Sequence, residues 1–283
     1  MLQHADITEN IEITSGSATL SGTLYHPQAA PKAAVLLHGA TAVPQRFYRH
    51  FAAWLASEGY ACLTYDYQDF GASATGKPKH AKATMVDWGL HDQSAAQAAL
   101  AARLPNVPLW VIGHSLGGFM VPFHKNASQI DRLITVASGT AYVSDHPWPY
   151  RAVATLFWHI LGPVGIALLG YLPGRRLGIG HDLPAGVFWQ WRRWCTSKTF
   201  YAADIGTCLP AFTKPAFTGP FKLIAISDDE MVPPKSVWKI MKYFPEAMKR
   251  QKVLRPEEFG LKRIGHIEAF SRKNAVLWPE IIK

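Results

Sequence analysis

The chain has 283 residues, of which 48% are hydrophobic and 17% are charged, and its formal net charge is +9. These proportions are typical of a folded globular protein and exclude a largely disordered chain, because no long stretch combines low hydrophobicity with high charge. The cationic residues form isolated pairs without a nucleic-acid-binding motif, so we predict no nucleic-acid partner and attribute the charge to solubility or to attraction of acidic substrates.

The first half of the chain alternates between strand and helix patterns. Strand and turn residues between positions 7 and 25 predict two or three antiparallel strands. Apolar runs predict further strands at residues 33–37, 60–65, 109–112 and 133–137. Helices are expected at residues 48–58 and 84–104, the second opened by a capping pair of Thr84 and Asp87, and after residue 115. This alternation predicts a doubly wound, mostly parallel α/β sheet.

The alternation stops between residues 140 and 220, a stretch that holds five of the ten tryptophans. We interpret it as a helical cap inserted over the carboxyl-terminal edge of the sheet, with residues 1–139 and 221–283 forming the core. Trp158, Trp189 and Trp191 are the expected substrate-binding residues, because aromatic side chains over that edge would line an apolar pocket. The alternative is that these tryptophans only fill the core of the cap itself.

Residues 152–174 of this insert carry no formal charge and are numerous enough to span a bilayer. Gly162 and Pro163 interrupt the run, His159 lies inside it, and the chain on both sides must return to one sheet. We therefore expect two apolar cap helices with a lipid-like binding face and no stable membrane span. Contact with a membrane interface stays open.

Alternation resumes after the insert. A strand is predicted at residues 221–226, a helix at 235–244, a short strand at 252–254 and a terminal helix at 270–282. Pro279 is expected to kink that last helix or to begin its final turn.

Residues 109–119 read Leu-Trp-Val-Ile-Gly-His-Ser-Leu-Gly-Gly-Phe. An apolar strand pattern runs directly into a Gly-x-Ser-x-Gly pentad, which helix-compatible residues follow. Gly113 and Gly117 leave room for a sharp turn, because side chains at these positions would collide with the flanking strand and helix. The stretch therefore predicts a nucleophile elbow with Ser115 as the nucleophile.

A serine hydroxyl needs a histidine to take its proton and a carboxylate to hold that histidine. In doubly wound hydrolases the order along the chain is serine, acid, histidine. His266 is the only histidine that follows the acidic loop after residue 226. Asp229 is the predicted acid, since it stands three residues before Val232, and Asp228 is the alternative. The backbone N–H groups of Ala40 and Leu116 are the predicted oxyanion donors.

Four segments together resemble the α/β-hydrolase superfamily over nearly the whole chain: His38-Gly39, Gly113-His-Ser-Leu-Gly117, Asp229-Glu-Met-Val-Pro233 and Gly265-His266. Within it, the sequence is similar to predicted serine hydrolases near the serine aminopeptidase and monoglyceride lipase-like branch. The resemblance implies an α/β-hydrolase fold with a cap between the sixth and seventh strands. Residues 66–73 depart from the Arg-Gly-x-Gly pattern of many relatives, which leaves the subfamily open.

These residues predict a cofactor-independent serine hydrolase, either a carboxylesterase or lipase-like, that cleaves an ester of an apolar acyl substrate through an acyl-enzyme. Acyl transfer, thioesterase or peptidase chemistry with the same triad, and a non-catalytic binding protein of this fold, are the alternatives. Residues 71–77 match the start of a phosphate-binding P-loop, but Pro78 removes the hydroxyl that binds magnesium. No metal-ligand spacing is present, so we expect neither a metal nor a cofactor.

The cysteines and the first residues bear on location. Cys62, Cys195 and Cys208 are an odd and widely spaced set, which argues against a disulfide framework. The first ten residues are polar and contain no apolar run of signal-peptide length. We therefore expect a cytoplasmic protein and make no prediction of its oligomeric state.

Overall fold

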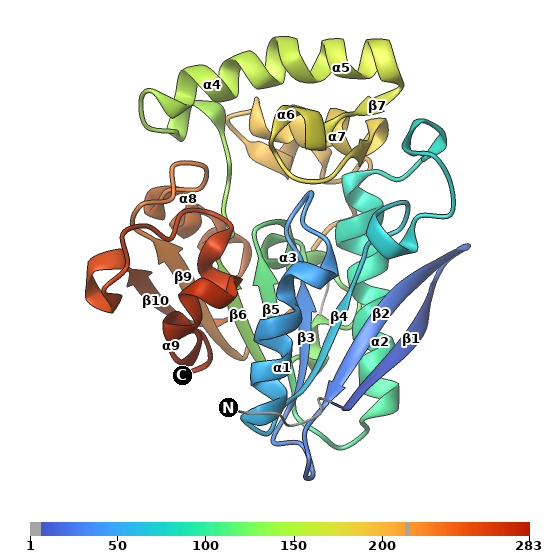
Figure 1. Cartoon of the computed structure of the whole chain (residues 1–283), viewed down its shortest axis with the longest axis vertical. Coiled ribbons are helices and arrows are strands. Elements are labelled where there is room, and N and C mark those ends of the chain that lie inside the picture. Colours follow the sequence, from blue (N-terminus) through green and yellow to red (C-terminus); the bar gives the residue numbers. More distant parts are fainter. Residues whose placement is uncertain (1–6, 213–215) are drawn as a thin grey trace.

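The computed structural model describes residues 7–212 and 216–283. Its central sheet contains, in chain order, β1 (Ile7–Ser15), β2 (Ala18–His26), β3 (Ala34–His38), β4 (Ala61–Tyr65), β5 (Leu109–His114), β6 (Arg132–Val136), β9 (Pro220–Ile226) and β10 (Met248–Leu254). The spatial order is β1-β2-β4-β3-β5-β6-β9-β10 (Figure 1). β1, β2 and β4 pair antiparallel, and all other neighbours pair parallel. The predicted doubly wound, mostly parallel sheet is confirmed.

Helices cover both faces of this sheet and thereby bury its central strands on both sides. Along β3, Val35 and Leu37 pack on one face with α1 (Arg49–Ser57) and α9 (Trp278–Ile282). Leu36 packs on the other face in the core that includes α2 (Gln93–Arg103). The continuous apolar runs that predicted these strands therefore reflect burial from two sides.

The predicted start of the helix after Thr84 is confirmed, whereas the predicted terminal helix is not. Asp87 accepts the Thr84 backbone N–H at 2.8 Å, and its own N–H donates to the Thr84 hydroxyl at 3.3 Å, which is a reciprocal cap. A π-helical segment (Asp87–Asp92) then leads into α2. The single helix predicted over residues 270–282 is wrong, because residues 272–277 form a 3-10 segment with a non-helical backbone at Asn274. Only α9 is α-helical there, and Pro279 stands in its first turn.

The chain between β6 and β9 forms a helical layer at one end of the sheet. It contains α4 (Tyr150–Leu156), a π-helical segment (Phe157–Leu161), α5 (Gly162–Leu169), β7 (Tyr171–Leu172), α6 (Gly174–Leu177), β8 (Leu183–Pro184) and α7 (Ala185–Cys195). In Figure 1, α4 and α5 lie across the top of the molecule, above α6 and α7 and over the ends of the central strands.

The expected pair of helices in this layer is wrong, because α4, the π-helical segment and α5 form one continuous helix, Tyr150–Leu169. Pro163 follows the π-helical segment directly, and the wider turn of that segment accommodates a residue without an N–H inside the continuous helix. Gly162 serves packing, since a Cβ there would overlap the ring of Phe188 in α7. The glycine therefore admits an aromatic neighbour without ending the helix.

This helix is long and apolar enough to cross a membrane by length and composition alone. Its most apolar 18-residue window has a mean hydropathy of 1.9, and only 22% of that window is buried against the protein. Within residues 7–212 and 216–283 it is the only helix that meets these criteria. Most of its apolar side chains therefore face outward.

Candidate active site

Ser115 occupies a strained turn between β5 and α3 (Leu116–Phe119). Its backbone angles are φ 53° and ψ −115°, a region that residues with a Cβ rarely adopt. A Cβ at Gly113 would overlap the Gly117 backbone, and a Cβ at Gly117 would overlap the backbone oxygen of His38. The two glycines thus let the strand, the turn and the helix pack closely, and they hold the serine at the end of β5.

His266 lies between Ser115 and Asp229. Its Nε2 is 3.0 Å from Ser115 Oγ, and its Nδ1 is 2.7 Å from Asp229 Oδ2. The His266 side chain is 8% exposed, and the Asp229 side chain is fully buried. The Asp229 carboxylate accepts the Nδ1 proton, which leaves the Nε2 lone pair facing the serine hydroxyl. The structure therefore brings together the three residues predicted as nucleophile, base and acid.

Asp229 is held in its ionised form. Burial by itself raises the pKa of this carboxyl group, but the nearby His266 and the hydrogen bond from its imidazole outweigh that effect. Backbone N–H groups of Met231 and Val232 also donate to Asp229 Oδ1, at 2.9 and 2.8 Å. The net result is a pKa below the ordinary value. A carboxylate that is charged at neutral pH orients the imidazole and stabilises its protonated form.

Asp228, the alternative acid, has a different position. Its two carboxylate oxygens accept the backbone N–H groups of Ile264 and Gly265, both at 2.9 Å. These residues immediately precede His266. Asp228 therefore holds the loop that carries the histidine, whereas Asp229 contacts the imidazole.

A buried hydrogen-bond relay lies behind the site. His114 Nε2 is 2.9 Å from the backbone oxygen of His266, so this nitrogen carries the proton. Its Nδ1 then accepts from the Tyr48 hydroxyl at 2.8 Å, and that hydroxyl accepts the Ala40 N–H at 2.9 Å. Burial, together with the nearby His266, lowers the pKa of His114 to about 3. The neutral imidazole thus links the loop after β3 to the loop that carries His266.

The relay changes the expectation for the oxyanion donors. The Ala40 N–H, one of the two predicted donors, points to Tyr48 and is not free in this structure. The sequence places Ala40 after a strand, but it does not reveal the tyrosine hydroxyl that occupies its N–H. Leu116 is the first residue of α3, so its N–H has no acceptor within that helix. Of the two, Leu116 is the one positioned to meet a developing negative charge.

Removing the Tyr48 hydroxyl should destabilise the protein. In Tyr48→Phe, the buried Nδ1 of His114 loses its donor, which costs about 1–3 kcal/mol of unfolding free energy. Urea denaturation measures the change. Tyr60→Phe is the matched control, since the Tyr60 ring packs on Trp110 and its hydroxyl has no partner among the described residues. Equal stability of the Tyr48 and Tyr60 variants would show that the relay carries no net stabilisation.

The three tryptophans predicted to bind substrate pack mainly within the insert. Trp158 is 4% exposed, and its ring lies 5.8 Å from that of Phe188 and 4.8 Å from that of Trp191. Trp189 is 43% exposed and lies under the Arg192 guanidinium. Trp158 and Trp191 therefore join the long helix to α7. This observation favours the alternative in which these side chains fill the core of the insert.

A cavity of about 720 Å³ runs along the first turns of the long helix. Apolar side chains that line it include Trp148, Leu156 and Ile160, and His146 closes one end. Burial lowers the pKa of His146, and the charges of Asp145 and Asp229 act against that shift. The flanking residues Asp145 and Pro147 line a neighbouring cavity together with Asp229, so this end lies near the triad acid. No periodicity in the sequence marks these lining residues, because they come from a loop and from one side of a helix that is apolar all round.

Comparison with known proteins gives one family match. A model of the serine aminopeptidase S33 family matches residues 28–168, a stretch that contains Ser115 and ends inside the long helix. Among curated proteins, none matches the sequence significantly.

Solved structures with the same fold cover almost the whole chain. A soluble variant of monoglyceride lipase from Saccharomyces cerevisiae, in complex with a substrate analogue, is 17% identical with a TM-score of 0.63, over 99% of this chain and 95% of that one. An esterase from Pyrococcus furiosus is 15% identical with a TM-score of 0.58, over 96% and 92%. A serine hydrolase without a lid from Xanthomonas campestris is 12% identical with a TM-score of 0.55, over 97% and 93%. The sheet order, the family match and these structures agree. The chain belongs to the α/β-hydrolase superfamily.

Proposed function

We propose that this chain is a cofactor-independent serine hydrolase that cleaves esters with an apolar acyl group. The observation that carries the proposal is the position of His266, within hydrogen-bonding distance of Ser115 Oγ on one side and of Asp229 on the other. This is the arrangement that nucleophilic catalysis by serine requires.

In the first half of the reaction, His266 Nε2 takes the hydroxyl proton as Ser115 Oγ attacks the ester carbonyl carbon. The Leu116 N–H donates to the oxyanion, and the tetrahedral intermediate then expels the alcohol, which takes the proton from His266. In the second half, His266 removes a proton from water, and the resulting nucleophile attacks the acyl-enzyme. Collapse of that intermediate releases the carboxylic acid and returns the proton to Ser115.

Ester cleavage is preferred to peptide cleavage because the apolar side chains of Trp148, Leu156 and Ile160 line the cavity along the long helix. Two of the solved structures of this fold are a monoglyceride lipase and an esterase, which supports the same choice. Acyl transfer to an alcohol or thiol uses the same acyl-enzyme. Product analysis with competing alcohols separates transfer from hydrolysis.

We further propose that residues 140–220 act as a cap on a core formed by residues 1–139 and 221–283. The helical layer lies over the ends of the central strands, on the side where Ser115 follows β5 (Figure 1). A cap in this position contributes one wall of the substrate cavity.

If the cavity along the first turns of the long helix holds the acyl group, the rate should depend on the length of that acyl group. Each methylene buried there contributes about 0.8 kcal/mol, so kcat/KM for 4-nitrophenyl esters should rise about fourfold per carbon until the cavity is full. Ala152→Phe places a ring in the cavity and should remove this gain. Ala203→Phe, at an exposed alanine of the insert outside the cavity, should keep it. A rate that is flat or falls beyond acetate in the wild type would make the insert a purely structural lid.

The outer face of the long helix is a candidate for contact with a lipid surface. A stripe of exposed apolar side chains at helical spacing follows this face: Val153, Leu156, Ile160, Val164 and Leu168. Arg151 lies at the amino-terminal end of the helix. A continuous exposed apolar stripe with a basic end is typical of a helix that lies in a membrane interface. Leu156 and Ile160 of this stripe also line the cavity, so such contact would bring an apolar ester to the cavity itself.

Vesicle flotation measures this contact. The wild type should float with liposomes of phosphatidylcholine and phosphatidylglycerol, and the double variant Val164→Glu, Leu168→Glu should stay at the bottom of the gradient. Val276→Glu, which charges an exposed apolar residue outside the insert, is the control and should float. Flotation of the double variant, or its absence in the wild type, would exclude the interface proposal.

The cysteines support a reducing compartment. Cys62, Cys195 and Cys208 all lie in the described residues, and each is a free thiol. Free thiols persist in the cytoplasm, where we place the protein.

A further inference from the structure

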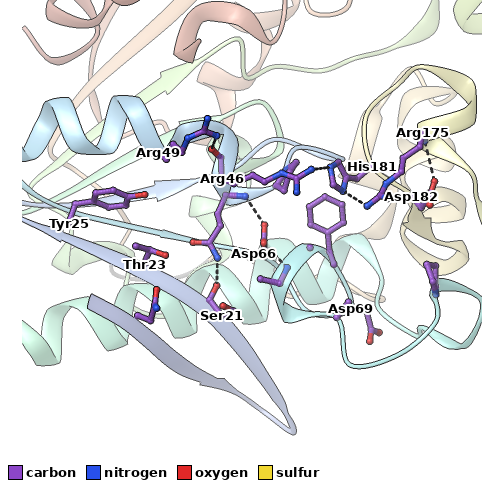
Figure 2. Close-up of a pocket in the computed structure, with 18 residues that line it drawn as sticks. Ser21, Thr23, Tyr25, Arg46, Arg49, Asp66, Asp69, Arg175, His181 and Asp182 are labelled. Atoms are coloured by element: carbon purple, nitrogen blue, oxygen red, sulfur yellow. Dashed lines mark hydrogen bonds between the residues drawn. The ribbon is translucent and has the colours of Figure 1, made fainter. Parts of the chain in front are cut away.

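A second cavity has a volume of about 750 Å³, and Figure 2 shows the residues that line it. Its lining residues come from β2, the 3-10 helix η1 (Gln45–Tyr48), the loop after β4 and the insert around α6. None of the three triad residues lines it. It is therefore a site separate from the candidate active site.

Three arginines line this cavity without carboxylate partners. Among the described residues, Arg46, Arg49 and Arg175 form no ion pair. Three aspartates also line it, but their oxygens face backbone N–H groups. Asp66 accepts from Gln45 and Ala72, Asp69 from Lys82 and Ala83, and Asp182 from Arg175. The three carboxylates match the three guanidinium groups in formal charge, but they are held by backbone N–H groups and form no ion pair with these arginines.

Each ring nitrogen of His181 lies next to an arginine nitrogen. Arg46 Nη2 is 2.9 Å from its Nε2, and Arg175 Nη2 is 3.1 Å from its Nδ1, as Figure 2 shows. A guanidinium only donates hydrogen bonds, and a neutral imidazole has a single lone pair. At least one arginine N–H therefore faces another N–H. An anion with several oxygens would give every one of these donors an acceptor.

The P-loop-like residues 71–77 border the same cavity, but they do not supply a phosphate cradle. The Ala72 N–H donates to Asp66, and the Ser73 N–H donates to the backbone oxygen of Phe70. Recognition in this cavity therefore rests on side chains, and those of Arg46, Arg175 and His181 are the donors that converge on one point.

We propose that this cavity binds a phosphate group between Arg46 and Arg175, with His181 as a third donor. A phosphate suits the site because its terminal oxygens accept from two guanidinium groups and an imidazole at once. Arg46 belongs to the core, whereas Arg175 and His181 belong to the insert. The bound anion would link the core and the insert beside the loop after β3. There the backbone N–H of His181 already donates to the Ala42 backbone oxygen at 2.9 Å.

Isothermal titration of the whole protein with sodium phosphate, against sodium chloride of equal ionic strength, tests the site. The wild type should bind one phosphate saturably. Arg46→Gln and Arg175→Gln should each weaken binding at least about tenfold, since each removes charge-assisted hydrogen bonds. Arg176→Gln is the matched control, because Arg176 is an exposed neighbour that does not line the cavity. Thermal melting of each variant checks that it is folded, and Arg175→Lys provides a second, charge-conserving change that should retain part of the affinity.

Further ligands and hydrogen exchange complete the test. Phenyl phosphate binding with the affinity of inorganic phosphate would assign the site to phosphomonoesters, and binding of inorganic phosphate alone would assign it to the free ion; both support the proposal. Phosphate should also slow exchange of the His181 amide. The proposal is overturned if the wild type shows no saturable binding, if acetate binds as tightly as phosphate, or if Arg176→Gln loses as much affinity as Arg175→Gln. These outcomes do not depend on ester cleavage.

Discussion

Replacing Ser115 with alanine should abolish labelling by a fluorophosphonate probe and lower kcat for ester hydrolysis by about a million-fold. The probe reacts only with a serine whose proton a neighbouring base removes, and Ser115 Oγ is 3.0 Å from His266 Nε2. The elbow should stay intact in Ser115→Ala, because the backbone angles are set by the packing around Gly113 and Gly117. Gel fluorescence and an ester assay measure the two effects.

Ser236→Ala is the control for this experiment. Its hydroxyl is buried and has no partner among the described residues, so its removal should leave both labelling and turnover unchanged. Equal labelling of wild type and Ser115→Ala would refute the assignment of the nucleophile. A wild type that binds an apolar ligand tightly but is neither labelled nor active would favour the non-catalytic alternative.

Asp229→Asn should lower kcat by about ten-thousand-fold. The asparagine amide would present an N–H to His266 Nδ1, so the imidazole would carry its proton on Nε2 and could not accept one from Ser115. Asp228→Asn should have a mild effect, because an amide oxygen still accepts one of the two N–H groups that Asp228 now holds. The two residues are adjacent, which makes each variant the control for the other.

Steady-state kinetics with one ester separates these roles. The Asp229 variant should lose kcat with little change in KM, since the acid acts on the chemical step. If Asp228→Asn proved the more damaging substitution, the role of acid would pass to Asp228, and the hydrogen bond from His266 to Asp229 would be merely structural.

The strands of the sheet and the turn at Ser115 follow from signals that lie close together in the sequence. Apolar runs predict the buried strands, and the pentad around Ser115 predicts the turn, because both depend on neighbouring residues. His266 and Asp229 could be chosen because their order along the chain is restricted in this kind of sheet.

The parts that the sequence did not reveal depend on pairs of residues far apart in the chain. Tyr48 and His114 are 66 residues apart in the sequence, so nothing local signals that the Ala40 N–H is occupied. Gly162 looked like a helix breaker because its partner, Phe188, lies in another helix. The contacts of Trp158 with Phe188 and Trp191 are likewise between residues far apart in the chain. The sequence therefore could not tell which tryptophans fill the core of the insert and which line a substrate cavity.

The backbone at Ser115 also bears on the choice between catalysis and simple binding. A residue with a Cβ in such a conformation raises the free energy of the folded state by about 1–3 kcal/mol, out of a typical margin of about 5–15 kcal/mol. The φ angle of 53° at Ser115 therefore lowers the free energy of unfolding, and in return it holds the serine hydroxyl at the end of β5. A protein of this fold that only bound a ligand, without using the hydroxyl of residue 115, would be more stable with glycine at position 115.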